Sequence, residues 1–281
     1  MIKRKFIKNL GLAALASAIS FSTAIHAQAP KKVTIALAGD GLHVSTIHIA
    51  NLGGFFKEEG IELDLVDVNS GPRQVAAMMG GSADFAILGF IHTIKAYNEG
   101  GEILAVASLF DVLDTHIFLT NDALKKSGIT PDMPIDEKVK RMQGLRIGIS
   151  SPGSTTDTVV RTLFKARGMD PDKVVQLQPL GGSSNMLAAV EKNLTDGFAW
   201  SAPQPEIAEL KGLGKIVINP LKGEVPEMKD VPYQSLATSR QVYEKKPEET
   251  LRTLRAVQGY EVFPGETGPG QGPGAHALPC H

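Results

Sequence analysis

Residues 145–168 read LRIGISSPGSTTDTVVRTLFKARG, in which an apolar run leads through a loop rich in serine, threonine and glycine into a second partly apolar segment. Residues 33–60, VTIALAGDGLHVSTIHIANLGGFFKEEG, follow the same order, and both stretches close on the pattern Phe-Lys-x-x-Gly. Each apolar run predicts a buried strand, and the residues after each polar loop predict a helix. The chain therefore carries one strand–loop–helix unit twice.

The two copies stay in step beyond these stretches. Each continues with a second strand, at residues 61–68 and 174–178, and then with a helix and a third strand. The third strands begin with similar motifs, DFAILG at residues 84–89 and DGFAW at residues 196–200. Alternating strands and helices predict mostly parallel sheets with helices on both faces. Two such series therefore predict an α/β protein with two lobes.

Two further predicted strands, residues 116–120 and 234–238, belong to neither copy and predict hinge connections between the lobes. We divide the chain into a signal segment, a first lobe, a second lobe with the hinge crossings, a segment that returns to the first lobe, and a tail: residues 1–27, 30–115, 116–232, 233–258 and 259–281.

The first 27 residues are basic at their start and apolar afterwards. Four basic residues precede an apolar run over residues 10–25, and the small residue Ala27 follows. This order is typical of a secretory signal peptide cleaved near Ala27, and the run is too short to favour a membrane anchor. Lys3 to Lys8 also fit a twin-arginine signal with lysine in place of the first arginine. We expect a soluble periplasmic protein, exported by either route.

Removal of this segment makes the chain acidic. The whole sequence has 29 Lys+Arg and 30 Asp+Glu. The first 27 residues hold four of the basic residues and none of the acidic ones, so 29 − 4 = 25 basic residues remain against 30 acidic ones. A net charge of about −5 does not favour a nucleic-acid partner, because such proteins usually carry a basic surplus.

The composition also argues against several kinds of chemistry. Cys280 is the single cysteine, which excludes an internal disulfide framework and a multi-cysteine metal site. The 7 histidines are scattered without the spacing of metal ligands. The motifs of serine hydrolases, zinc proteases, P-loop proteins and dinucleotide-binding proteins are absent. We therefore expect no cofactor, no metal and no catalytic activity.

Ligands of open α/β sheets bind beyond the carboxyl ends of the strands. The loops at such ends are residues 39–45, 69–73, 89–92, 150–156, 181–184 and 200–204. If the two lobes face each other, these loops line one cleft that closes around a small ligand. The ligand-binding candidates in or beside these loops are Asp40, Gly41, His43, Ser45, Gly71, Arg73, Gly89, Phe90, Ser151, Ser154, Thr155, Ser183 and Trp200.

Loop 150–156 has the most suggestive composition, because hydroxyls and free backbone N–H groups at a helix start suit an anion. Helix capping is the alternative role of its hydroxyls. Arg73 either pairs with a carboxylate or sulfonate or is a solvated surface residue. Asp40 either holds an amino group or caps a turn. His43 and Trp200 either contact the ligand or have structural roles.

Four segments resemble the periplasmic solute-binding proteins of the nitrate, sulfonate and taurine type, a group with relatives that bind the pyrimidine precursor of thiamine. They are residues 50–61, 81–86, 145–149 and 196–203, and the resemblance extends over residues 33–257. It implies the two-lobed type II periplasmic-binding-protein fold and a monomer that captures a small, anionic organic solute by hinge closure. It also implies delivery of that solute to the permease of an ABC importer in the inner membrane.

Other functions stay open beside this one. The thiamine-precursor synthases of the same superfamily carry a cysteine-rich motif that this chain lacks, which counts against the enzyme alternative. A sensor subunit that presents its ligand to a membrane receptor is a further alternative. The glycine- and proline-rich residues 259–281 depart from the family, whose members continue with helices that complete the first lobe. We interpret them as a truncated or altered end, with a natural flexible tail as the alternative.

Overall fold

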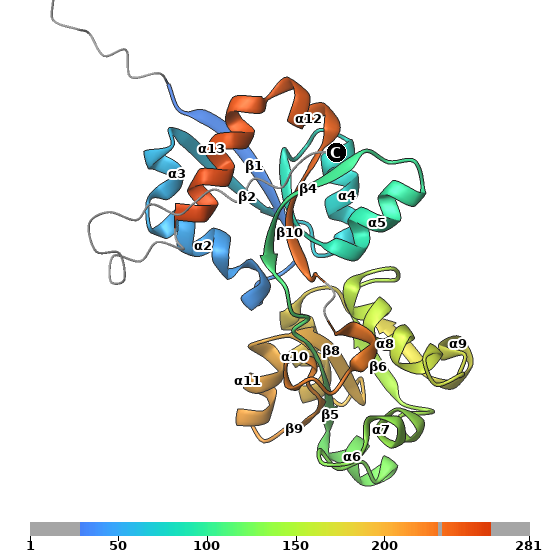
Figure 1. The fold of residues 1–281 in the computed structure, drawn as a ribbon. Coiled ribbons are helices and arrows are strands. Elements are labelled where there is room, and N and C mark those ends of the chain that lie inside the picture. The colour runs from blue at the N-terminus through green and yellow to red at the C-terminus, as the bar shows by residue number, and fades with distance from the viewer. Residues whose placement is uncertain (1–28, 230–231, 260–281) are drawn as a thin grey trace, which may run out of the picture.

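The computed structural model describes residues 29–229 and 232–259. The predicted signal peptide and residues 260–281, with Cys280, lie outside the described residues. The described part contains two five-stranded sheets, each at the centre of one lobe (Figure 1). Lobe 1 is built on the sheet β2-β1-β3-β10-β4, and lobe 2 is built on the sheet β7-β6-β8-β5-β9. The prediction of a two-lobed α/β architecture is confirmed.

Lobe 1 combines the amino-terminal part of the chain with its end. Its strands are β1 (Lys31–Leu37), β2 (Ile61–Asp67), β3 (Phe85–Gly89), β4 (Ile103–Phe110) and β10 (Gln234–Ser239). Its helices are α2 (Ser45–Leu52), α3 (Phe55–Glu58), α4 (Gly71–Met79), α5 (Phe90–Asn98), α12 (Arg240–Lys245) and α13 (Pro247–Gln258), with the short 3-10 helix η1 (Leu42–Val44). Strand β1 runs parallel to β2 and β3, whereas β10 is antiparallel to both of its neighbours, β3 and β4.

Lobe 2 repeats this arrangement. Its strands are β5 (Thr115–Thr120), β6 (Arg146–Ile149), β7 (Gln176–Pro179), β8 (Gly197–Ser201) and β9 (Gly214–Ile218). Its helices are α6 (Asn121–Ser127), α7 (Ile135–Arg141), α8 (Thr155–Lys165), α9 (Pro171–Val174), α10 (Ser183–Glu191) and α11 (Gln204–Leu210). Strand β6 is parallel to β7 and β8, and β5 is antiparallel to both β8 and β9. The two sheets therefore share one topology, as the doubled sequence unit predicts.

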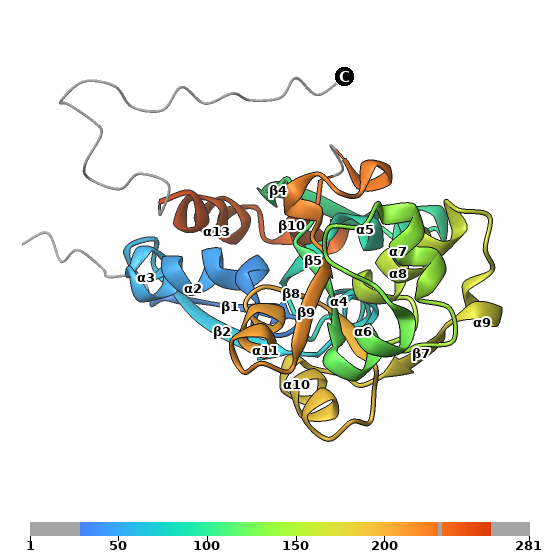
Figure 2. The same ribbon diagram turned by 90° about the horizontal axis from the view of Figure 1, so that it is seen from below.

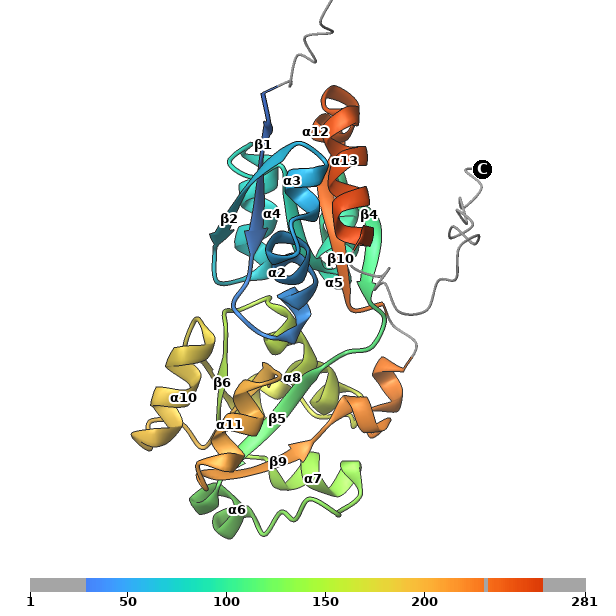
Figure 3. The ribbon, with the colours of Figure 1, turned by 90° about the vertical axis from the view of Figure 1, so that its left-hand side faces the viewer.

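The antiparallel strand of each sheet is reached by a crossing from the other lobe (Figure 3). The first crossing, residues 111–114, leads from β4 into β5. The second crossing leads from β9 into β10 and contains the 3-10 helices η2 (Pro220–Lys222) and η3 (Pro226–Met228). At its end the second crossing meets lobe 1, where Tyr233 N–H donates to the carbonyl of Phe110, the last residue of β4, at 2.9 Å.

Each sheet is packed on both faces, because successive side chains of a strand point in opposite directions. Ile35 and Ile87 pack on one face of the lobe 1 sheet with residues of α2 and α13, whereas Ala36 and Leu88 pack on the other. Lobe 2 has the same two layers. Trp200, the single tryptophan of the sequence, lies in the layer with α10 and α11. Figure 2 shows helices on both sides of the strands.

Residues 200–204 lead directly into α11, which begins at Gln204 and has Pro205 in its first turn. Proline is tolerated in a first helical turn, where the backbone N–H has no intrahelical acceptor. The strand expected at residues 174–178 is shifted to Gln176–Pro179 because Asp170 caps a preceding short helix, α9, which takes up Val174.

The aspartate that precedes the third strand has the same role in both lobes. Asp84 accepts a hydrogen bond from Thr34 N–H at 3.0 Å, and Asp196 accepts one from Arg146 N–H at 2.8 Å. Each carboxylate therefore ties the start of the third strand to the first strand of its own sheet. Asp196 also forms an ion pair with the Arg146 side chain at 2.8 Å. The bond from a backbone N–H of the first strand to the aspartate, which both lobes share, gives a physical reason for the motif repeated at residues 84 and 196.

We predict that Asp196→Ala lowers the free energy of unfolding of lobe 2 by about 2 kcal/mol, since it removes charge-assisted bonds to a strand backbone. Burial acts to raise the pKa of Asp196, but hydrogen bonds from Arg146 outweigh it and lower the pKa. The contribution is therefore present above the unfolded-state pKa of about 4 and lost as the pH falls through the folded-state value.

Urea denaturation followed by Trp200 fluorescence measures the free energy of unfolding of the native chain and of Asp196→Ala. The control is Glu62→Ala, a substitution at an exposed position. The gap between the native chain and Asp196→Ala should narrow below about pH 4. Equal unfolding midpoints for the two chains at pH 7 would contradict the assigned role.

Candidate functional site

A cavity of about 40 Å³ lies between the lobes, and we call it the central cavity. Five of the six predicted loops contribute to its wall, as expected for the carboxyl ends of parallel strands. Its lining is Ala38, His43, Ser70, Gly71, Gln74, Gly89 and His92 from lobe 1, Ser150, Ser154, Thr155, Thr156, Trp200 and Ser201 from lobe 2, and Tyr233 and Gln234 from the second crossing and β10.

The two lobes are in direct contact around this cavity. Across the cleft, His92 Nε2 lies 3.2 Å from Thr155 Oγ1, and Leu42 N–H donates to the Ala202 carbonyl at 2.8 Å. Asp40 Oδ1 accepts two further hydrogen bonds, from Ser183 Oγ at 2.5 Å and from Gln204 Nε2 at 3.3 Å. The sixth predicted loop, residues 181–184, takes part through Ser183. The structure therefore shows a closed arrangement in which a solute would be enclosed.

Glycines permit this close approach. A side chain at Gly39, whose φ is +93°, would come within 3.0 Å of the Trp200 ring in the opposite lobe. A side chain at Gly89 would come within 2.8 Å of Thr155 Oγ1, also across the cleft. A side chain at Gly71 would overlap the imidazole of His92. Gly39 and Gly89 therefore serve the fit between the lobes, whereas Gly71 makes room for His92 within lobe 1.

Both histidines of the central cavity are held neutral. Burial, followed by the nearby Lys95 charge, lowers the pKa of His92 to about 4. Burial also lowers the pKa of His43, although the carboxylate of Asp114 acts in the opposite direction. His43 Nε2 lies 3.2 Å from the Ala38 carbonyl and can donate to it, which leaves Nδ1 as an acceptor. Near pH 7 neither ring brings a positive charge to the cavity.

The cavity offers uncharged hydrogen-bonding groups. Among the described residues, no lysine or arginine lines it. His43 Nδ1, Trp200 Nε1 and Gln234 Oε1 are buried, and none of them has a hydrogen-bond partner within the described part of the chain. A buried polar atom without a partner costs free energy, and all three atoms belong to residues that line the cavity. Two of them accept hydrogen bonds and one donates.

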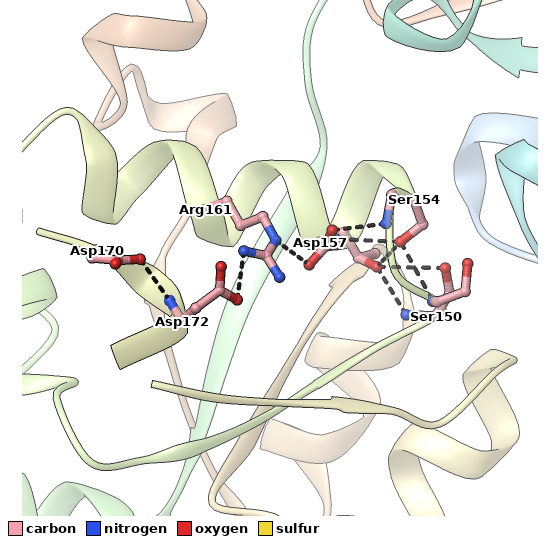
Figure 4. A network of polar contacts seen from close by, with 9 residues as sticks. Ser150, Ser154, Asp157, Arg161, Asp170 and Asp172 are labelled. Atoms are coloured by element: carbon pink, nitrogen blue, oxygen red, sulfur yellow. Dashed lines mark hydrogen bonds and ion pairs between the residues drawn. The ribbon is translucent and has the colours of Figure 1, made fainter. Parts of the chain in front are cut away.

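Loop 150–156 satisfies most of its own polar groups (Figure 4). Ser154 Oγ accepts from Asp157 N–H at 3.3 Å, which is the helix cap that the sequence offered as the alternative role. Thr156 Oγ1 lies 2.9 Å from Ser154 Oγ and accepts from Ser150 N–H at 2.9 Å. The carboxylate of Asp157 accepts from Gly153 N–H at 2.8 Å. The start of α8 therefore already has a carboxylate of its own.

The structure brings some of the sequence-predicted residues together and places others elsewhere. Those that line the central cavity are His43, Gly71, Gly89, Ser154, Thr155 and Trp200. Arg73 is exposed on α4 and does not line it. The other candidates do not line the cavity either. Asp40 and Ser183 bond to each other, and Gly41 is buried beside His43. Ser45 begins α2, Phe90 begins α5 and lines a neighbouring pocket, and Ser151 is half-buried before Ser154.

Several lining residues were missed by the sequence analysis. Tyr233 and Gln234 stand at the start of β10, and an antiparallel strand begins at the edge where its parallel neighbours end. That rule would have placed them in the site. Tyr233 Oη lies 3.0 Å from Ser201 Oγ and 3.3 Å from Thr115 Oγ1, and burial raises its pKa, so the hydroxyl stays protonated. Gln74 follows Pro72 by two residues and donates to the carbonyls of β1 and β3.

The described residues contain no cluster of histidine, cysteine, aspartate and glutamate side chains suited to a metal ion. No helix within residues 29–229 and 232–259 is long and apolar enough to cross a membrane.

The family model of the NMT1-like family matches residues 26–259. This chain belongs to the NMT1-like family. A 4-amino-5-hydroxymethyl-2-methylpyrimidine phosphate synthase of Candida albicans is 30% identical over 133 residues, which are 47% of this chain and 35% of the synthase. YtlA of Bacillus subtilis, which is named as a binding protein, is 25% identical over 222 residues, or 78% of this chain and 61% of YtlA. The chain thus spans only about a third to three-fifths of these relatives.

Solved structures establish the fold of this NMT1-like chain. The periplasmic nitrate-binding protein NrtA of Synechocystis superposes with a TM-score of 0.65 at 20% identity, covering 82% of this chain and 61% of NrtA. The alkanesulfonate-binding protein SsuA of Xanthomonas axonopodis, bound to MOPS, gives 0.64 at 18% identity, covering 82% and 73%. The periplasmic-binding-protein fold and the family relationship implied by the sequence resemblance are confirmed.

The neutral state of His92 predicts a pH-dependent stability. An unfolded chain takes up a proton at this side chain near pH 6.5, but the folded chain does so only near pH 4. The free energy of unfolding should therefore fall as the pH is lowered from 6.5 to 4, by about 3 kcal/mol from this residue. His43 acts in the same direction.

Urea denaturation at pH 7, 6, 5 and 4 measures this loss. His92→Gln should flatten the pH profile, whereas His48→Gln, at an exposed position of α2, should leave it unchanged. A His92→Gln profile parallel to that of the native chain would show that the ring titrates normally.

Proposed function

We propose that this protein is the extracytoplasmic solute-binding component of an ABC importer and that it captures its solute by closing two lobes on each other. The observation that carries the proposal is the central cavity, which is lined by both lobes and by the second crossing. A solute there contacts every part that moves during hinge closure. The names of the structural neighbours NrtA and SsuA, a nitrate-binding and an alkanesulfonate-binding protein, support the same role.

The polar groups of the cavity favour a solute that is neutral or donates hydrogen bonds. The two histidines are neutral, and no lysine or arginine of the described chain lines the cavity. Asp114 in the first crossing is 5% exposed, and neither carboxylate oxygen has a hydrogen-bond partner in the described residues. Its charge acts on both His43 and Tyr233. A negative charge that acts on two residues of the cavity wall opposes the entry of an anion.

An anionic solute, which the sequence predicts, is the competing outcome. The names of NrtA and SsuA favour it, since nitrate and sulfonates are anions. In this chain, however, Arg73 is exposed and the start of α8 holds the carboxylate of Asp157. Arg73 is therefore not available inside the cavity, and loop 150–156, although it lines the cavity, already gives the Gly153 N–H to the carboxylate of Asp157.

Thermal-shift and calorimetric titration with small solutes tests the proposal. We expect stabilisation by neutral N–H donors such as ethylurea and 4-aminopyrimidine, and not by nitrate or ethanesulfonate. Trp200→Phe, which removes an N–H donor, should weaken binding about tenfold, while Tyr97→Phe at an exposed site should not. If only anions stabilise the chain, the charge assignment is wrong.

Asp114→Asn sharpens this test. Removing the buried charge should admit anions that the native chain excludes, because the repulsion disappears while the cavity keeps its size. Recovery of the bound solute unchanged, together with stimulation of an importer's ATPase by the loaded protein, is expected of a transport component. Conversion of the solute would favour the synthase alternative instead.

A further inference from the structure

A second pocket lies beside the central cavity and is lined mostly by apolar side chains. Its volume is about 250 Å³, and we call it the apolar pocket. Its lining includes Ile91 and Ile94 of α5, Val159 and Thr162 of α8, and Leu113 of the first crossing. The pocket therefore takes its walls from both lobes and from the hinge, as the central cavity does.

The apolar pocket and the central cavity share two wall residues, Thr155 and Tyr233. A third hollow, of about 240 Å³, is lined by Gly39, Asp40, Ser183 and other polar residues, and none of its lining residues belongs to the cavity. A solute that extends from the central cavity past Thr155 or Tyr233 would thus enter the apolar pocket. Figure 1 shows α5 and α8 facing each other where the two lobes meet.

The sizes of the two spaces make such an extension necessary for all but the smallest solutes. One water needs roughly 10–15 Å³ of such volume, so the 40 Å³ of the central cavity holds only a few non-hydrogen atoms. A cavity of roughly 150 Å³ is known to bind benzene, and the apolar pocket, with 250 Å³, is larger. A ring or a short alkyl chain therefore fits it.

The wall of the apolar pocket also gains from being covered. Ile91 and Ile94 are 38% and 47% exposed, although both are large aliphatic side chains. Glu227 lies at the pocket, but its charge is engaged by Arg167 at 3.0 Å. Contact with an apolar group would remove isoleucine surface from water without leaving a charge unpaired.

From these observations we infer that the apolar pocket is a second subsite for the same solute. It takes an aliphatic or aromatic substituent, while the polar end of the solute occupies the central cavity. The class of solute is then a small amphipathic molecule with a compact hydrogen-bonding head. This inference rests on the proposed function. Because α5 and α8 belong to different lobes, the substituent also helps to hold the lobes closed.

Ile94→Trp tests the subsite, since a larger side chain at a partly exposed position fills the pocket without disturbing the core. Leu52→Trp, at a site that is 88% exposed on α2 and does not line the pocket, is the matched control. The probes are methylurea, ethylurea, butylurea and hexylurea, titrated by calorimetry. In the native chain and in Leu52→Trp, affinity should rise by up to about fourfold per added methylene. In Ile94→Trp it should stay flat.

A second probe separates failure of the subsite from failure of the proposed function. Cyclohexanol should shift the methyl NMR signals of Ile91 and Val159 in the native chain but not in Ile94→Trp. That result supports the subsite even if no urea binds in the central cavity. Ureas that bind with no dependence on chain length would overturn the subsite and leave solute capture standing. Cyclohexanol shifts that are absent, or equal in both chains, would also overturn it.

Discussion

The chain passes between the lobes twice, and each passage ends as an antiparallel strand inside the sheet of the next lobe. Because β5 and β10 both start at the edges where the parallel strands end, the two binding edges must face each other. The bond from Tyr233 N–H to the Phe110 carbonyl ties the end of the second crossing to β4, the strand from which the first crossing leaves. The position of the cleft between the two sheets follows from this double passage of the chain.

In the proposed function, closure of the cleft has a free-energy cost that a solute offsets. His43 Nδ1, Trp200 Nε1 and Gln234 Oε1 are buried in the closed arrangement without a partner among the described residues. Each unpartnered group costs roughly 1–3 kcal/mol, and opening the cleft would return these groups to water. A solute that bonds to them therefore binds the closed form better than the open one, which is the condition for coupling binding to closure.

The sequence was sufficient for the parts of the fold that rest on local patterns. The apolar runs, the glycines that end helices and the doubled motifs at Asp84 and Asp196 each act within one lobe, so periodicity and turn chemistry reveal them. It was less informative about the site, where the orientation of each side chain depends on packing across the cleft. Arg73 and Gln74 are neighbours on α4, yet only Gln74 turns inward. His92, one turn into α5, meets its partner Thr155 only through closure.

The two lobes keep one scaffold but present different chemistry. Asp84 and Asp196 make the same backbone bond in both sheets, so the strands and their loops start from equivalent positions. The loop after β1 brings the ring of His43, whereas the loop after β6 brings hydroxyl groups that bond mainly to one another. A solute captured as we propose would consequently meet acceptors on one side and a hydroxyl-rich wall on the other. Such an asymmetric lining fixes the orientation of a ligand, which a symmetric pair of loops could not do.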